Sequence, residues 1–452
     1  MEVTRALARY LVGSNPGAIL PGVKKQATRS VLNWLGCAIG ACRHDTVERA
    51  LAALAPFSGP AQASVLGRGE RLDILHAALI NGMSSHVFDF DDTHLKTVIH
   101  PSGPVAAAIL ALAEMQPHGA PVSGADFLHA FILGVEAECR IGNAVYPEHY
   151  DVGWHITGTA GVFGAAAAAG RLLGLSEQRM TWALGIAATQ SAGVREMFGT
   201  MCKPFHPGAA ARNGLMAALL ARNDFTSSNQ AIEAKRGFAH VLSTGFRPDE
   251  ITEGLGERFE VALNTYKPFA CGIVIHPAID GCIQLRNEYK LTGAEIGRIA
   301  LKVHPLVLEL TGKKTPQAGL EGKFSVYHSA AVAIIHGSAG EAQYSDACVR
   351  DPRVIALRDK VSAEIEPGLH EDAARIAITL QDGRTLTRHV EHAVGSLARP
   401  MSDADLEAKF RGLAQAVLPG AQVATLIERV WALETLADAG AIARASAPVT
   451  PR

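Results

Sequence analysis

"GTAGVFGAAAAAGRLLGL" (residues 158–175) consists almost entirely of glycine, alanine and aliphatic residues. Alanine is the strongest helix former, and side chains as small as those of glycine and alanine let neighbouring helices approach closely. No strand pattern precedes the stretch, so a phosphate-binding glycine loop is not expected. The stretch therefore predicts a tightly packed helix in the core of a helical domain.

The chain around this stretch, up to about residue 265, is also rich in alanine and glycine and shows helical periodicity. "SGAD" (123–126) places Ser123 and Asp126 at capping-box spacing ahead of a further apolar run. We therefore predict a first, mainly helical domain over residues 1–265.

The composition changes after this point. Residues 296–310 are rich in β-branched and aliphatic residues, and residues 374–390 alternate in polarity around Asp382-Gly383, which is a strong hairpin signal. A helix is expected between them, at residues 323–337. These features predict a smaller α+β domain over residues 266–398.

The last part of the chain returns to helical patterning. Ser402 and Asp405 follow Pro400 at capping-box spacing and predict the start of a new helix. We expect residues 399–452 to form C-terminal helices that pack back on the first domain. The fold class is therefore mainly α, with a large helical domain and a smaller α+β domain.

Composition excludes several classes of protein. The 452 residues carry a formal net charge of −2, so no basic surface for nucleic acid is expected. The seven cysteines form no CxxC pair, which argues against structural zinc and a disulfide framework. The N-terminus lacks a signal-peptide pattern, and the apolar runs are too short to span a membrane. We expect a cytoplasmic enzyme with no membrane partner.

Lysine or histidine precedes proline more often than chance placement would give. Proline pushes the residue before it towards extended backbone, so each of these cations is expected on a loop or at the end of an element. Such positions often carry function. His304 falls within the predicted strand segment and is the least suited to a functional role. The six residues are His100, Lys203, His206, Lys267, His276 and His304.

"DFDDTH" (89–94) is the densest cluster of polar residues. It contains the DxDxT pattern of haloacid-dehalogenase-type phosphatases, but that pattern follows a buried strand, and residues 74–88 here have helical periodicity. A metal site would need Asp89, Asp92 and His94 to converge, and no helical histidine pair supports it. An Asx turn that binds its own backbone is a third interpretation.

Several long motifs, in order, resemble the MmgE/PrpD family. This resemblance implies a helical domain formed by both chain ends, an inserted α+β lid domain, a homodimer and an active site between the domains without metal or organic cofactor. The motifs are "NGMSSHVFDFDDTH…HPSGPVAAAILALAE" (81–114), "GWHITGTAGVFGAAAAAGRLLGL" (153–175), "FGTMCKPFHPGAAARNG" (198–214), "YKPFACGIVIHPAIDG" (266–281) and "EGKFSVYHSAA" (321–331).

The resemblance also implies the site residues. Some relatives have a tyrosine where this chain has His328, and Tyr327 and His328 point about 100° apart on a helix, so both cannot face one pocket equally. His86, His94 and His304 are interpreted as structural. The expected catalytic residues are His100, His155, Asp89, Lys203 and Lys267, and the expected substrate-binding residues are Thr93, His206, His276, Tyr327 and His328.

The family's substrates are small di- or tricarboxylates, which lose or gain a proton next to a carboxylate. Lysines stabilise the negative charge that develops on the carboxylate oxygens, and histidines transfer the proton. A dehydratase of a 2-methylcitrate-like hydroxy acid is the leading expectation. An epimerase of the iminodisuccinate type and a cis-aconitate decarboxylase are alternatives. A Mg²⁺-dependent phosphatase and an inactive binding module are hypotheses from other classes.

Overall fold

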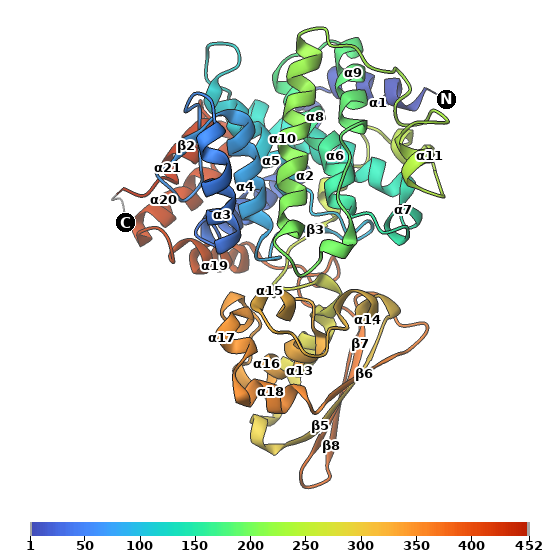
Figure 1. Cartoon of the computed structure of the whole chain (residues 1–452), viewed down its shortest axis with the longest axis vertical. Coiled ribbons are helices and arrows are strands. Elements are labelled where there is room, and N and C mark those ends of the chain that lie inside the picture. Colours follow the sequence, from blue (N-terminus) through green and yellow to red (C-terminus); the bar gives the residue numbers. More distant parts are fainter. Residues whose placement is uncertain (1, 450–452) are drawn as a thin grey trace.

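The computed structural model describes residues 2–449 and is mainly helical, as predicted. A large helical domain lies above a smaller domain of helices and one larger sheet (Figure 1). The helical domain contains α1 (Val3–Gly13), α2 (Pro21–Gly40), α3 (Asp45–Leu54), α4 (Ile74–His86), α5 (Ser102–Met115), α6 (Gly124–Val145), α7 (Glu148–Asp151), α8 (Ile156–Leu172), α9 (Glu177–Ala188), α10 (Cys202–Arg222), α11 (Phe238–Leu242) and α12 (Asp249–Thr252).

Both ends of the chain build this domain. The C-terminal helices pack beside α2 and α5, and their apolar side chains belong to the same core as those of the N-terminal helices. Ser402 and Asp405 form the predicted capping box. Two short pairs of strands also belong to this region, one within the helical domain and one at its border with the smaller domain. The elements are α19 (Asp403–Ala414), α20 (Gly420–Trp431), α21 (Gly440–Ala445), β1 (Ala63–Ser64), β2 (Arg71–Leu72), β3 (Thr93–His94) and β4 (Asn264–Thr265).

The glycine- and alanine-rich stretch forms α8, in the centre of the helical domain, which confirms its prediction. A Cβ atom on Gly164 would lie 2.8 Å from Oε2 of Glu138 in α6. A Cβ on Gly214 of α10 would lie 2.5 Å from the Val162 carbonyl oxygen. Both distances are too short for a real side chain, so the small residues allow α6, α8 and α10 to pack at close range.

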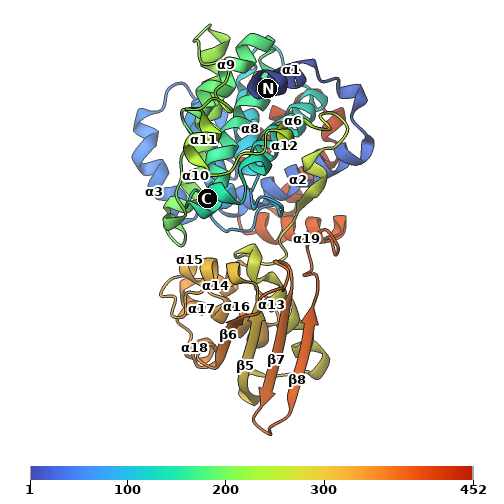
Figure 2. The same ribbon diagram turned by 90° about the vertical axis from the view of Figure 1, so that its right-hand side faces the viewer.

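The smaller domain has a four-stranded sheet with the order β6-β5-β7-β8. β5 and β6 are parallel and the other pairs are antiparallel. Helices α13 and α16 pack against the sheet. Figure 2 shows its strands β5, β7 and β8 side by side. The elements are α13 (His276–Tyr289), β5 (Ile296–Val303), α14 (Pro305–Thr311), α15 (Gly319–Gly322), α16 (Val326–His336), α17 (Asp346–Val349), α18 (Pro352–Arg358), β6 (Val361–Ile365), β7 (Ala374–Leu380) and β8 (Thr385–Val390).

Two sequence predictions for this domain have different outcomes. The hairpin is confirmed, because β7 and β8 pair around Asp382-Gly383 and Gly383 has the left-handed φ of 89°. The predicted strand at 296–310 is too long. It ends at Val303, where Pro305 removes a backbone donor, and His304 instead caps α14 by accepting a hydrogen bond from the Leu306 N–H.

The sequence predicted that no apolar run is long enough to span a membrane. Between residues 2 and 449, no helix is both long enough and apolar enough to cross a bilayer.

Candidate active site

The loop after α4 begins the site. Asp89 has a φ of 50°, a left-handed conformation that aspartate tolerates better than most residues. Its N–H donates to the His86 carbonyl oxygen at 2.8 Å, which ends the helix. The loop then enters β3, which pairs with β4 at the border of the two domains. This pairing brings the segment after β4, which carries Lys267, next to the DFDDTH loop.

Two lysines converge on one oxygen of Asp89. Nζ of Lys203, in the first turn of α10, lies 3.0 Å from Oδ1, and Nζ of Lys267 lies 2.9 Å from the same atom. Lys267 also donates to the carbonyl oxygens of Asp89 and Cys271. Burial alone would raise the pKa of Asp89, but the two ammonium groups hold it well below its usual range. Asp89 is therefore a buried carboxylate with two cationic partners.

His86, interpreted as structural from the sequence, belongs to this cluster. Its Nδ1 lies 2.7 Å from Oδ2 of Asp91, and its Nε2 lies 2.8 Å from Nζ of Lys203. Burial lowers the pKa of His86, so the ring is neutral near pH 7. Burial alone would raise the pKa of Asp91, but His86 and His100 lower it. The only sequence signal for His86 was its position three residues before Asp89, in the motif stretch.

His100 has a defined orientation. Its Nδ1 lies 2.9 Å from the Asp92 carbonyl oxygen, and because a carbonyl only accepts, Nδ1 carries the hydrogen. The Nε2 atom is then an unprotonated acceptor. The backbone N–H of His100 donates to Oγ1 of Thr157 at 3.1 Å. Burial lowers the pKa of His100 well below its usual value.

His155 pairs with a second histidine. The Nδ1 atoms of His155 and His206 lie 2.8 Å apart, so only one of them carries a hydrogen at this contact. Burial lowers the pKa of His155 well below its usual value and that of His206 to about 4. Both rings are neutral near pH 7, and the proton between them can lie on either ring.

All five predicted catalytic residues line one cavity between the domains. Thr93 lies just behind it, with Oγ1 3.4 Å from Nδ1 of His100. The helical domain contributes one wall, and the segment after β4, α14 and the loop before α16 contribute the other. The cavity is small, about 40 Å³. Its lining residues are Asp89, Val98, His100, Tyr150, His155, Phe198, Lys203, Lys267, Gly272, Ile273, Val274, Leu310, Thr311 and Phe324.

Comparison with family models identifies the family of this chain. The sequence model of the MmgE/PrpD N-terminal domain matches residues 5–251, and that of the MmgE/PrpD C-terminal domain matches residues 269–433. The chain belongs to the MmgE/PrpD family.

Curated relatives of this MmgE/PrpD protein align over most of its length. Cis-aconitate decarboxylase of Homo sapiens is 29% identical over 97% of this chain and 93% of its own. Cis-aconitate decarboxylase of Aspergillus terreus is 28% identical over 92% and 90%. 2-Methylcitrate dehydratase of Cupriavidus necator is 26% identical over 82% of each chain. These relatives are lyases, in agreement with the enzyme class predicted from the sequence.

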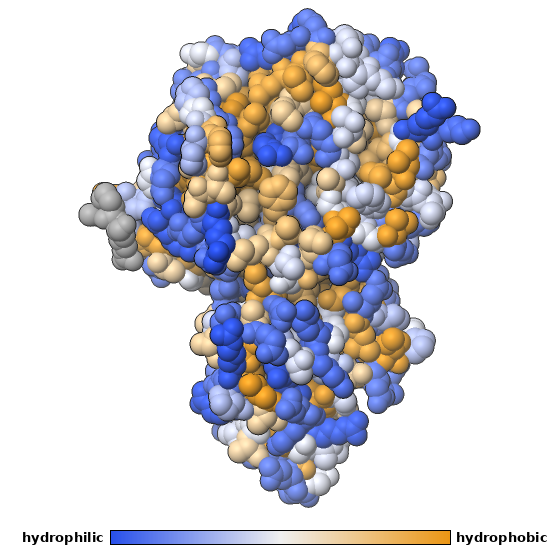
Figure 3. Space-filling view, in the orientation of Figure 1, coloured by the Kyte–Doolittle hydropathy of each residue, from blue (hydrophilic) through white to orange (hydrophobic). Residues whose placement is uncertain are grey.

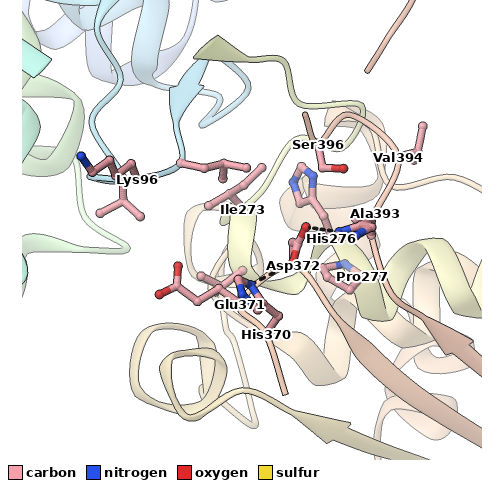
Figure 4. Close-up of a pocket in the computed structure, with 14 residues that line it drawn as sticks. Lys96, Ile273, His276, Pro277, His370, Glu371, Asp372, Ala393, Val394 and Ser396 are labelled. Atoms are coloured by element: carbon pink, nitrogen blue, oxygen red, sulfur yellow. Dashed lines mark hydrogen bonds and ion pairs between the residues drawn. The ribbon is translucent and has the colours of Figure 1, made fainter. Parts of the chain in front are cut away.

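None of the five predicted substrate-binding residues of this MmgE/PrpD chain lines the small cavity, although Thr93 and His206 contact two residues that do, His100 and His155. His276, at the start of α13, lines a neighbouring cavity of about 340 Å³, where His370 and His392 flank Asp372 (Figure 4). The two cavities share the walls formed by Val98, Ile273 and Val274. Burial lowers the pKa of His276 to about 3.

Neither Tyr327 nor His328 lines the small cavity, so their role in substrate binding stays a prediction. Ser325 caps α16, and this start of the helix directs His328 away, so that its Nε2 lies 2.8 Å from the Gln343 carbonyl oxygen. The Tyr327 ring lies beneath Lys314. Phe324, just before α16, lines the cavity instead.

Four residues have the ligand atoms of a metal site. His86, Asp89, Asp91 and His100 each offer one atom within 4.8 Å of the others. However, Asp89 already binds two ammonium groups and His86 accepts from one of them, so a divalent cation would meet two positive charges. The donor set does not suit Mg²⁺. Asp89 also follows a helix rather than a strand, which argues against the phosphatase hypothesis.

Proposed function

We propose that this protein is a cofactor-independent lyase that acts on a small di- or tricarboxylate by proton transfer at a carbon next to a carboxylate. One observation supports it most. Two buried lysines and two buried, neutral histidines line the same cavity between the domains. These side chains are suited to binding a carboxylate and moving a proton beside it.

The lysines would stabilise the intermediate. Removal of a proton next to a carboxylate places extra negative charge on the carboxylate oxygens. Lys203 and Lys267 are 5% and 1% exposed, so their ammonium groups act in a site with little water. Electrostatic stabilisation is strongest under such conditions, because the donors are already oriented and the local dielectric constant is low.

The histidines would transfer the proton. In the resting protein, Nε2 of His100 has the free lone pair that a base requires. His155 can present either a lone pair or an N–H, since it shares one hydrogen with His206. A bound polyanion would raise the pKa values of both rings towards neutrality, where acid–base catalysis is most efficient.

Dehydration of a 2-methylcitrate-like hydroxy acid is the reaction that we favour. It needs a base for the carbon-bound proton and an acid for the departing hydroxyl, and His100 and His155 supply two such groups. Cis-aconitate decarboxylation is the second candidate. It is kept as a candidate because the decarboxylases named above align over more of this chain than the dehydratase does. Epimerisation would use the same two histidines without a leaving group.

Substrate entry requires a change in the cavity. About 40 Å³ is far below the roughly 300 Å³ or more of a typical small-molecule site. The cavity walls come from both domains, so we expect the smaller domain to shift away from the helical domain when a tricarboxylate enters. This movement is consistent with the predicted role of the smaller domain as a lid.

Proton NMR in D₂O with EDTA tests the proposal on 2-methylcitrate, citrate, cis-aconitate, malate and iminodisuccinate. Dehydration of citrate or malate gives a new vinylic signal, and dehydration of 2-methylcitrate turns its methyl doublet into a singlet, because the new double bond carries no hydrogen. CO₂ loss from cis-aconitate indicates a decarboxylase, and α-deuteration without a new product indicates an epimerase. His100→Ala should abolish the signal, whereas His129→Ala, a buried histidine outside the cavity, should retain it. Calorimetric binding without turnover would favour the binding module, and activity restored only by Mg²⁺ would overturn the cofactor-independent mechanism.

We also propose that the protein is a homodimer. Helix α10 leaves Phe205, Ala209, Met216 and Leu219 incompletely buried along its outer face. Apolar side chains gather on this face of the helical domain in Figure 3. Light scattering after size exclusion should give twice the mass of one chain, and Met216→Glu should lower it. A monomer for the unmodified protein would contradict the proposal.

A further inference from the structure

His86 uses both of its ring nitrogens in buried contacts. It is the last residue of α4 and is 1% exposed. Nδ1 faces Oδ2 of Asp91 at 2.7 Å, and Nε2 faces Nζ of Lys203 at 2.8 Å. The ring therefore links a carboxylate that does not line the cavity to a lysine that does.

The direction of these hydrogen bonds follows from the donors. An ammonium group has only N–H donors, so Nε2 of His86 must accept from Lys203. The ring hydrogen is then on Nδ1, where it donates to Asp91. Asp91 is fully buried, and its carboxylate favours this tautomer because a carboxylate only accepts.

We propose that His86 and Asp91 are positioning residues that keep Lys203 as a charged ammonium and direct its remaining N–H into the cavity. The inference rests on the proposed function, in which Lys203 binds the substrate carboxylate.

The charges around Lys203 explain why a second anion is needed. Lys203 and Lys267 share one carboxylate, that of Asp89, so this anion cannot balance both. Burial favours the neutral amine of Lys203, and Lys267 lowers the pKa further, whereas Asp89 and Asp91 raise it. With Asp91 included, two carboxylates face two ammonium groups. The neighbouring His100, His155 and His206 rings are neutral and do not change this balance.

The third N–H of Lys203 has a suitable environment. Asp89 and His86 accept two of the three hydrogens. The rings of Phe198 and Phe324, whose centroids lie 5.3 Å and 5.5 Å from Nζ, line the cavity side by side next to the lysine. Aromatic faces attract a cation without accepting a strong hydrogen bond. The remaining N–H is therefore available to a carboxylate in the cavity.

Three variants separate the parts of this arrangement. Asp91→Asn removes the second negative charge but keeps a side chain of the same shape. His86→Leu removes the acceptor for Lys203. His86→Gln keeps an acceptor oxygen of similar reach and should restore much of the lysine's environment. His129→Gln is the matched control, because His129 is also buried but lies outside both cavities.

The experiment is a pH titration of the Lys203 side chain, followed by NMR of ε-¹³C-labelled lysine in the resting protein and assigned by the loss of its signal in Lys203→Arg. Loss of an opposite charge, or of an acceptor that hydrogen-bonds the charged form, lowers the pKa of a buried ammonium group by about 1 unit or more. We therefore expect the Lys203 midpoint to fall by at least about 1 pH unit in Asp91→Asn and in His86→Leu. His86→Gln should recover at least half of the shift, and His129→Gln should leave the midpoint unchanged.

An unchanged midpoint in both Asp91→Asn and His86→Leu would overturn the proposal. Asp91→Asn keeps side-chain size and one acceptor oxygen for the Nδ1–H of His86, so it provides the test if His86→Leu fails to fold. The titration uses no substrate and therefore gives a result even if no acid on the panel is turned over. If turnover is found, KM for the accepted acid should rise as the pH passes the Lys203 midpoint, and this rise should move to lower pH in Asp91→Asn.

Discussion

Asp89 and Glu138 are both buried carboxyl groups of the helical domain, but their surroundings differ. Asp89 has two ammonium partners, and its pKa lies well below the usual range despite its burial. Glu138 is fully buried between α6 and α8, and neither of its oxygens has a hydrogen-bond partner within residues 2–449. Burial raises its pKa well above the usual range. A buried carboxyl group therefore stays ionised only where cationic neighbours compensate its negative charge.

Asp89→Ala should have the largest effect on stability. The change leaves Lys203 and Lys267 close together without their shared counter-charge, and such uncompensated buried charge costs about 3–5 kcal/mol. Urea denaturation at pH 7 measures the loss. The folded-state pKa of Asp89 lies below the unfolded value of about 4. Its contribution is therefore complete above that pH, and the difference between the proteins should shrink in acid. A loss below about 1 kcal/mol at pH 7 would contradict the prediction.

Lys267→Gln should mainly affect turnover. It removes one ammonium group but leaves Asp89 paired with Lys203. The three hydrogens of Lys267 are donated to Asp89 and Cys271, so it would act on the substrate through its charge, and by analogy with the loss of one charge-stabilising group we expect kcat/KM to fall about 10²- to 10³-fold. The acid that the NMR panel identifies is the substrate for this measurement, and Lys235→Gln, a change at an exposed lysine outside both cavities, is the control. Retention of more than a third of the activity would exclude Lys267 from the proposed carboxylate site.

Glu138→Gln should change how stability depends on pH. The folded-state pKa of Glu138 is raised, so above the unfolded value of about 4.3 the unfolded chain releases a proton that the folded chain keeps. The stability of the unmodified protein therefore falls as pH rises, by up to about 1.4 kcal/mol per pH unit from this group. The variant lacks this slope. Urea denaturation at pH 5, 6 and 7 should show Glu138→Gln gaining relative to the unmodified protein, and parallel curves would show that Glu138 is ionised.

Gly164→Ala tests the tight packing around Glu138 and should have the smallest effect of the four. The new methyl group would lie 2.8 Å from Oε2 of Glu138 and 2.9 Å from the Gly134 carbonyl oxygen. Overpacking of this kind costs about 1–3 kcal/mol. Gly412→Ala in α19 is the matched control, since its Cβ meets no atom within 4 Å, and it should be neutral or stabilising by up to about 1 kcal/mol. Equal effects in thermal unfolding would mean that α6 and α8 can move apart.

Features set by neighbouring residues were predicted well. The helix of residues 158–175 and the hairpin at Asp382-Gly383 follow from local composition and turn chemistry, and both are present. The motifs that resemble the MmgE/PrpD family also placed the five catalytic candidates in one cavity. The sequence did not settle how the residues on α16 are oriented, because Ser325 determines where that helix starts and therefore which way Tyr327 and His328 point.

The sequence by itself determined the family, the mainly helical fold and the chemical types of the site residues. Only the tertiary structure decided how the charges are paired. Lys203 meets His86 across 117 residues, and Lys267 meets Asp89 across 178. These contacts depend on the packing of α10 against α4 and on the pairing of β3 with β4, and no local pattern reports either. For this reason His86 and Asp91 were not recognised from the sequence, although a buried ammonium group needs such partners.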